Sequence, residues 1–187
     1  MTVPVVVLDA CVLYPAAQRD LFMWLAATGA IRAHWTNTIH DEWMRNVARD
    51  FDIKRKDLDH IARLMNQHAS GSLISRYRQH ENLFAATDAK DRHVAAAALV
   101  ARKHSGAAVV TVITWNLKDF GQQELARHGL VTEDPDTFLC RLLGDFPKNV
   151  MDAFERIVGS GKWEVGSGKW EVGSGKWEAN TTLNSKL

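Results

Sequence analysis

The stretch VPVVVLDACVLYP, residues 3–15, decides the fold of this chain. Its first half is a continuous run of β-branched and aliphatic residues, which is typical of a strand buried on both faces, as in a parallel sheet. A carboxylate, Asp9, follows this run directly. Because a charge beside an apolar strand costs free energy unless it has a partner or a task, we consider Asp9 a candidate functional residue. The alternative is that Asp9 caps the turn that follows.

Amphipathic helical patterns separate this strand from other strand patterns further along the chain. Helices are expected in residues 19–30, 36–51, 54–68, 88–103, 136–146 and 147–158, and strands in residues 31–35, 109–113 and 129–133. Residues 70–87 are expected to form a loop. Strands that alternate with helices predict an α/β fold, which we expect to be a three-layer α/β/α sandwich with a central parallel sheet.

Length and composition predict one folded domain. The chain has 187 residues, 46% of them hydrophobic and 24% charged, and its formal net charge is +1. This balance excludes a globally basic nucleic-acid-binding protein, so contacts with nucleic acid would have to use local runs such as residues 54–56 and 76–78. We expect residues 1–157 to form the domain.

Residues 158–178 are three perfect tandem copies of VGSGKWE. Such a repeat is typical of a recent tandem duplication or an engineered linker. The Gly-Ser-Gly units favour flexibility, so residues 158–187 are expected to be a disordered tail. The alternative is a set of short strands that align Trp163, Trp170 and Trp177.

The cysteines and the N-terminus indicate a cytoplasmic location. Cys11 and Cys140 match no zinc spacing, and we interpret both as small buried apolar residues in a reducing compartment. The chain shows no signal-peptide pattern and no apolar run of membrane-spanning length.

The segment TDAKDRHVAAAAL, residues 87–99, places two acids before an alanine-rich helix. Asp88 suits the N-cap position, and Asp91 would then occupy the third helical position and turn toward the sheet. Both acids also suit the positive end of the helix dipole. We therefore expect Asp88 chiefly to start the helix and Asp91 chiefly to point into a site.

Four segments that are distant in sequence each carry an acid at a position that a parallel sheet would bring to one common edge. These acids are Asp9, Glu42, Asp91 and Asp119. Clustered carboxylates repel each other unless a cation compensates them, and Mg²⁺ prefers oxygen ligands. The pattern therefore predicts metal-assisted phosphodiester cleavage. Glu42 could instead pair with Arg45 or Arg49. Asp119 could instead pair with Lys118 or Arg92, while Thr114 and Asn116 could simply form a turn.

Other catalytic classes lack support. No HExxH motif, Walker A loop, GxGxxG loop or Gly-x-Ser-x-Gly elbow occurs in the sequence. His40 and His93 neighbour proposed ligands in sequence, but we expect each to be a solvated or hydrogen-bonded histidine rather than a ligand.

Three blocks, VVVLDACVLYP, DAKDRHVAAAAL and VITWNLKDF, resemble the blocks of PIN-domain proteins. They are most similar to the branch that carries Asp-x-x-Asp-x-His-Val and Thr-x-Asn-x-x-Asp-Phe. The resemblance extends over about residues 3–143 and implies a metal-dependent nuclease pocket.

By position, the resemblance implies that Asp9, Glu42, Asp91 and Asp119 are the catalytic acids, with Asp9, Asp91 and Asp119 as ligands of Mg²⁺ or Mn²⁺. Asp88, Thr114 and Asn116 would be supporting residues. The implied activity is endonucleolytic cleavage of single-stranded RNA. The resemblance also implies a role as the toxin of a toxin–antitoxin pair, with an antitoxin protein and a second copy of the chain as possible partners.

Three other functions stay open at this point. One is a catalytically degenerate PIN-like module that binds RNA or protein without cleaving. Another is a phosphatase with Asp9 as nucleophile, although Cys11 stands where such enzymes have a second aspartate. The third is an interaction module built on residues 149–158 and the tryptophan repeats.

Overall fold

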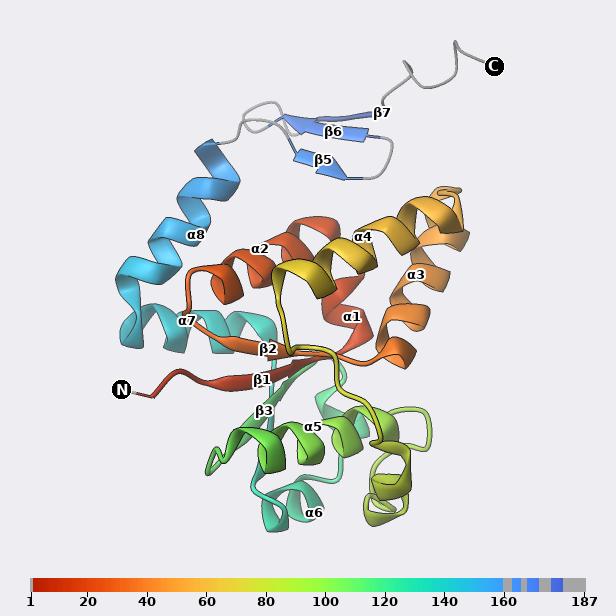
Figure 1. Ribbon diagram of the computed structural model, residues 1–187, viewed down its shortest axis with the longest axis vertical. Helices are drawn as coiled ribbons and strands as arrows, with labels where there is room; N and C mark the ends of the chain where they lie inside the picture. Colours follow the sequence, from red (N-terminus) through yellow and green to blue (C-terminus); the bar gives the residue numbers. More distant parts are fainter. Residues whose placement is uncertain (1, 160–162, 166–167, 172–175, 180–187) are drawn as a thin grey trace.

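A four-stranded parallel sheet lies at the centre of the protein, whose computed structural model describes residues 2–159, 163–165, 168–171 and 176–179 (Figure 1). The strands β1 (Val5–Leu8), β2 (Arg32–His34), β3 (Val110–Ile113) and β4 (Leu130–Glu133) lie in the order β2-β1-β3-β4. Every residue of β1 and β3 is buried, as the two apolar runs predict. The predicted α/β fold with a central parallel sheet is therefore confirmed.

Helices cover both faces of the sheet (Figure 1). On one face α5 (Arg92–Ser105) packs against β1 and β3, and α6 (Gln122–Arg127) packs against β4. The other side carries α1 (Ala10–Leu13), α2 (Ala16–Ala27), α3 (Asn37–Phe51), α4 (Arg55–His68), α7 (Pro135–Asp145) and α8 (Pro147–Gly159). Two 3₁₀ helices, η1 (Arg78–Leu83) and η2 (Leu117–Asp119), precede α5 and α6.

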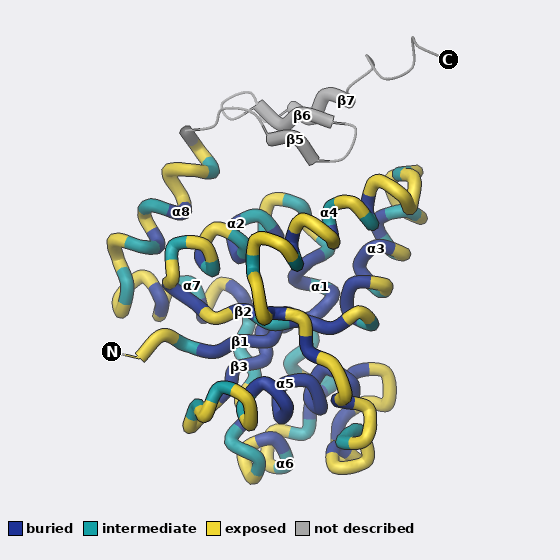
Figure 2. The backbone as a smooth tube through the Cα atoms, in the orientation of Figure 1, coloured by how far each residue is buried: buried dark blue, intermediate teal, exposed yellow. Residues whose placement is uncertain are grey.

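Most of the alanine-rich helix α5 is buried on all sides. Every residue from His93 to Ala101 is buried, and Figure 2 shows this part of the helix in dark blue. The sheet lies on one side of α5, and η1 packs against it as well. A helix enclosed in this way has no polar face, and its small side chains allow close approach to the strands. The position of the residue before α5 is thereby tied to β1 and β3.

A buried hydrogen-bond network holds α3 to α4. The indole Nε1 of Trp35 donates to Asn66 Oδ1 at 2.7 Å, and His40 Nε2 lies 3.3 Å from the same oxygen. Trp43 Nε1 donates to His40 Nδ1 at 3.0 Å, which assigns the proton of the ring to Nε2. His40 is therefore a buried structural histidine. At the start of α3, Thr36 Oγ1 accepts a hydrogen bond from the Ile39 N–H group, as its capping position predicts.

The strand order places a topological switch between the two central strands. The chain leaves β1 for β2 on one side of it, whereas β3 and β4 lie on the other side. In open parallel sheets, a crevice forms outside the carboxyl ends of the strands at such a point. Asp9 and Thr114 are the residues that directly follow β1 and β3.

Several local expectations differ from the structure. The second helix begins at Ala16 rather than near residue 19, because Pro15 occupies its N-cap position. The short helices α1 and α6 and the 3₁₀ helix η1 were not expected, since segments this short carry no periodicity. Cys140 is exposed rather than buried, and Cys11 is only partly buried. Within the described parts of the chain, no helix is long and apolar enough to cross a bilayer.

The described parts of the repeats form three short antiparallel strands, β5 (Trp163–Val165), β6 (Gly168–Glu171) and β7 (Lys176–Ala179). Trp163 pairs in register with Trp170, and Trp170 pairs with Trp177. This is the arrangement considered above as the alternative to a flexible tail. The expected disorder of residues 160–162, 166–167, 172–175 and 180–187 concerns residues that lie outside the described ones.

Replacing Ala96 by leucine tests the close packing of α5. Ala96 is fully buried, so the larger side chain should lower the free energy of unfolding by about 1–3 kcal/mol. Lys103→Leu, on the exposed end of the same helix, is the matched control and should change it by less than about 0.5 kcal/mol. Urea denaturation measures both, and equal effects would show that α5 is not tightly packed.

Candidate functional site

A cavity of about 400 Å³ opens at the carboxyl edge of the sheet. Three of the four predicted acids line it, namely Asp9 after β1, Glu42 on α3 and Asp91 before α5. Other polar residues of the lining include Cys11, Arg45, Asn46, Arg49, Lys90 and Asn116. The fold thus brings together carboxylates that are far apart in sequence.

Asp9 is fixed by three donors. Its Oδ1 accepts the Ala10 N–H group at 2.6 Å, so it caps α1, while its Oδ2 accepts the Thr114 hydroxyl at 2.7 Å. Thr114 is fully buried and its Oγ1 also accepts the Asn116 N–H group at 3.0 Å. Asp9 therefore serves both as a cap and as part of the cavity wall, and Thr114 supports it.

Cys11 is the third donor to Asp9, with its Sγ 3.2 Å from Asp9 Oδ2. Burial, and then the charge of Asp9, raise the pKa of the Cys11 thiol to about 12. The thiol therefore stays protonated at neutral pH and is a hydrogen-bond donor here, not a nucleophile. Its role was not predicted, because the sequence only suggested a small buried residue.

Asp91 is the least compensated acid of the cavity. Only 7% of the residue is exposed, and its Oδ2 is buried without a hydrogen-bond partner among the described residues. Burial, and then the charge of Asp9, raise the pKa of Asp91 to about 6. A buried carboxylate of this kind favours a proton or a cation.

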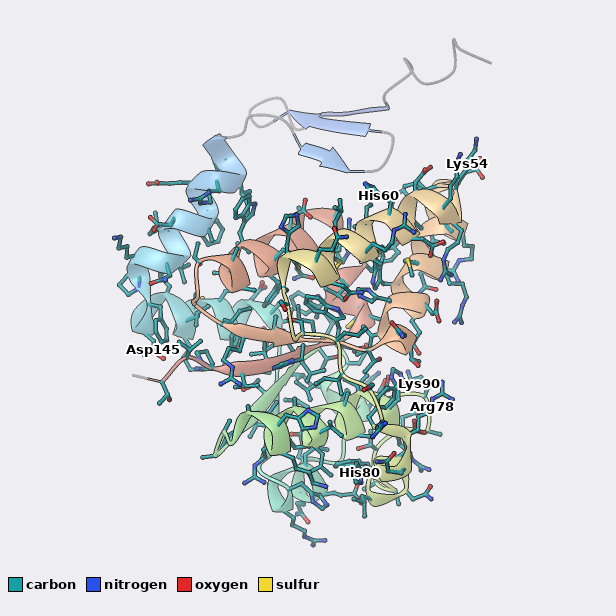
Figure 3. The ribbon with its side chains drawn as sticks, viewed as in Figure 1. Lys54, His60, Arg78, His80, Lys90 and Asp145 are labelled. Atoms are coloured by element: carbon teal, nitrogen blue, oxygen red, sulfur yellow. The ribbon has the colours of Figure 1, made fainter. Side chains whose placement is uncertain are left out.

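Lys90 supplies a positive charge between two of the acids. Its Nζ lies 2.9 Å from Asp119 Oδ2 and 3.8 Å from Asp91 Oδ2. The hydrogen bond to Asp119, with the charge of Asp91, raises the pKa of Lys90. Figure 3 labels Lys90 at the end of the sheet where α5 begins. Asp119 is bound to this lysine and does not line the cavity, and the pairings with Lys118 or Arg92 considered above do not occur.

The prediction that Asp88 is the N-cap residue of the alanine-rich helix is wrong. The helix α5 begins at Arg92, and Asp91 occupies its N-cap position without a side-chain capping bond. Asp88 organises the preceding turn instead: its Oδ1 accepts the Lys90 N–H group at 3.2 Å, and its own N–H group donates to the Asp119 carbonyl at 2.8 Å. The sequence DAKD forms a turn before the helix rather than its first turn. Asp88 therefore positions the segment and does not line the cavity.

Glu42 lies within ion-pair distance of a histidine that sequence analysis had not assigned to the site. His93 Nε2 lies 3.1 Å from Glu42 Oε1, and His93 is buried. Burial alone would lower the pKa of His93, but the contact with Glu42 outweighs it, and the pKa is raised. Asp41, the neighbour of Glu42, pairs with Arg55 outside the cavity. The helix geometry thus selects Glu42 rather than Asp41.

The cavity-facing side of α3 continues with basic and amide groups. Arg45, Asn46 and Arg49 follow Glu42 at intervals of three, four and seven residues, which places them on one helix face. Arg49 is paired with Asp50 at 2.7 Å, whereas Arg45 makes no ion pair with any described residue. Helical periodicity could have identified this face, since it lies beside the apolar stripe.

The described residues contain no group of three or more His, Cys, Asp or Glu side chains arranged to hold a metal ion. The cavity nevertheless offers one feature that fits a cation: the buried Oδ2 of Asp91, close to the charge of Asp9, has no hydrogen-bond partner among the described residues. Binding Asp119 as well would require Lys90 to leave it. The donor set consists of oxygens, which suits Mg²⁺ or Mn²⁺ rather than a soft metal.

Scans against protein-family models, curated proteins and solved structures each found no match. The resemblance to PIN-domain proteins is thus carried by the three sequence blocks and is compatible with the α/β fold.

The raised pKa of Asp91 predicts that the difference in the free energy of unfolding between wild type and Asp91→Asn depends on pH when no divalent metal is present. The folded protein holds the proton of Asp91 up to a pH of about 6, whereas the unfolded chain releases it near 3.8. The stability contributed by this proton is present below pH 3.8 and is lost as the pH rises to about 6. Above that pH, Asp91→Asn should therefore be more stable than wild type by on the order of 1–2 kcal/mol.

Chemical denaturation in EDTA from pH 4 to pH 8 measures this difference. Asp41→Asn, which removes an exposed acid, should leave the pH profile of wild type unchanged. A constant difference between Asp91→Asn and wild type across this range would contradict the uncompensated charge of Asp91.

Proposed function

We propose that this protein is a Mg²⁺- or Mn²⁺-dependent endoribonuclease of the PIN-domain type that cleaves single-stranded RNA. The observation that carries the proposal is the meeting of Asp9, Glu42 and Asp91 in one cavity at the switch point of the sheet. Asp9 and Asp91 stand in the PIN-like blocks, and Glu42, which lies outside these blocks, matches the second family acid by its position in the chain.

The surroundings of each acid suggest its role in the reaction. Asp9 and Asp91, with Asp119 once Lys90 has moved, would hold the metal, directly or through water. A bound divalent ion supplies charge that neutralises the phosphate and activates water. Glu42, oriented by His93, would accept a proton from the attacking water as its oxygen bonds to phosphorus. The bond to the leaving ribose oxygen then breaks, and that oxygen takes up a proton.

Two basic residues are available for the phosphate backbone. Arg45 lines the cavity without an ion pair to a described residue. Arg78 lies near the start of α3, with its Nη2 3.4 Å from Thr38 Oγ1. Lys54 lies at the far end of the helical layer in the same view, so the basic run at residues 54–56 is not part of this cavity.

A degenerate PIN-like module that binds RNA or protein without cleavage is the second proposal. The ammonium group of Lys90 favours this second proposal, because the group already compensates the charge of Asp119 and lies 3.8 Å from Asp91. Such a module would need no metal. The nuclease is preferred because Asp91 Oδ2 keeps no hydrogen-bond partner among the described residues.

The toxin role, with an antitoxin as partner, and the cytoplasmic location belong to the same proposal. Expression in a bacterial host should arrest growth, and a neighbouring gene that relieves the arrest would supply the antitoxin. Two free cysteines support a reducing compartment.

Cleavage of single-stranded RNA tests the proposal directly. The wild-type protein should cleave with Mg²⁺ or Mn²⁺ and not with EDTA. Asp9→Asn and Asp91→Asn should each lower the rate by at least about 100-fold, since each removes a carboxylate that holds charge at the reacting phosphate. Asp41→Asn, on the outer side of α3, is the matched control and should retain the wild-type rate.

Thermal unfolding with and without Mg²⁺ separates the two proposals. A nuclease should be stabilised by Mg²⁺ in the wild type and not in Asp91→Asn. Binding of RNA in EDTA with no cleavage and no stabilisation by Mg²⁺ would favour the degenerate module. Full Mg²⁺-dependent cleavage by Asp91→Asn would show that the site is wrongly assigned.

Replacing His93 tests the orientation of Glu42. His93→Ala removes the partner 3.1 Å from Glu42, so kcat should fall by about 10- to 100-fold while KM for RNA changes little. His93→Gln keeps a donor and should recover part of this loss. The circular dichroism spectrum of each variant checks the fold, and an equal loss in both variants would contradict the positioning role.

A further inference from the structure

The repeat sheet follows one pairing rule throughout. Trp163 opposes Trp170, and Trp170 opposes Trp177. Beside these pairs, a lysine always opposes a glutamate: Glu164 opposes Lys169, and Lys169 opposes Glu178. The triplet Lys-Trp-Glu is therefore complementary to itself when two copies run antiparallel.

This rule is a property of the repeat and not of one strand. Because the three copies are identical, any two strands of the sequence Lys-Trp-Glu meet in the same way. In the register, a tryptophan position opposes a tryptophan position at the centre, and a lysine position opposes a glutamate position on each side. Pairing within one chain therefore satisfies the same rule as pairing between two chains.

The sheet keeps two edges. In the order β5-β6-β7, only β6 has a neighbour on both sides within the described strands. An edge strand presents N–H and C=O groups that can pair with another chain. The strand β7 spans Lys176–Ala179 and so contains the complete Lys-Trp-Glu triplet.

We propose that β7 is a homodimerisation edge that pairs antiparallel with β7 of a second copy of this chain, about a two-fold axis at Trp177. In this pairing, Lys176 opposes Glu178 of the second copy, and Glu178 opposes its Lys176. The interface is isologous and closes as a dimer. It joins two three-stranded sheets into one of six strands, with an unbroken row of tryptophan positions.

A second copy is favoured over an unrelated strand by charge. A foreign strand would need a lysine, a central residue and a glutamate in the correct order to meet both charged positions of β7. Every copy of this chain carries that order three times. Like charges placed directly opposite each other destabilise a strand pair, so the same positions exclude most other strands.

Charge exchange across the interface provides the test in the full-length chain. The mass of the wild type should rise with concentration from 21.0 kDa toward twice that value in sedimentation equilibrium. Lys176→Glu alone places two glutamates in opposition, and Glu178→Lys alone places two lysines in opposition. Each variant should weaken dimerisation by about tenfold or more.

Mixing the two variants in equal amounts isolates the interface. In the mixed dimer both charged pairs are of opposite sign again, so dimerisation should return to within about threefold of wild type. The pairs within each chain are equally disturbed with and without mixing, so a purely intramolecular effect cannot produce the recovery. Lys54→Glu, an exposed lysine in the folded domain, makes the same charge change and should dimerise like wild type.

Three results would overturn the proposal. The first is a wild type that stays at 21.0 kDa at every concentration. The second is a single variant that dimerises as tightly as wild type, which would place the interface elsewhere. The third is the absence of recovery on mixing. None of these results depends on whether the protein cleaves RNA.

Discussion

The hydrogen bond from Thr114 Oγ1 to Asp9 Oδ2, 2.7 Å long and buried, joins the carboxyl ends of the two central strands. Strands β1 and β3 are neighbours, so the bond can form only in the observed register. The helix α5 packs on the same two strands and carries Asp91 at its start. A single strand pair therefore determines the distance between two acids that are far apart in sequence.

Each acid at this edge has a different source of compensation. Asp9 receives hydrogen bonds from a backbone amide, a hydroxyl and a thiol, and Glu42 lies 3.1 Å from His93 Nε2. Asp119 is neutralised by Lys90. Asp91 has only the Lys90 ammonium at 3.8 Å, and its Oδ2 has no hydrogen-bond partner among the described residues, so it is the least compensated acid of the cavity. The repulsion between these like charges is tolerated because every acid except Asp91 has a close hydrogen-bond or ion-pair partner.

The sequence predicts the central part of this fold well, for a physical reason. A continuous apolar run such as residues 5–8 has few stable surroundings besides a sheet covered on both faces, and its end then locates Asp9. Lys90 and His93 could not be found in this way. Their roles depend on the turn before α5 and on the docking of α3, and neither leaves a periodic signal. The start of α5 was misplaced for the same reason, since DAKD suits a turn and a helix start equally.

The uniform pairing rule of β5, β6 and β7 has a consequence for the length of the chain. Shifting the pairing of one repeat copy against another by seven residues leaves the opposed pairs of the Lys-Trp-Glu triplets chemically the same. Loss or gain of a copy would therefore narrow or widen the sheet by one strand without creating a mismatch. The number of repeat copies therefore does not change how the remaining strands pair. It sets only how many strands follow α8 in the sheet.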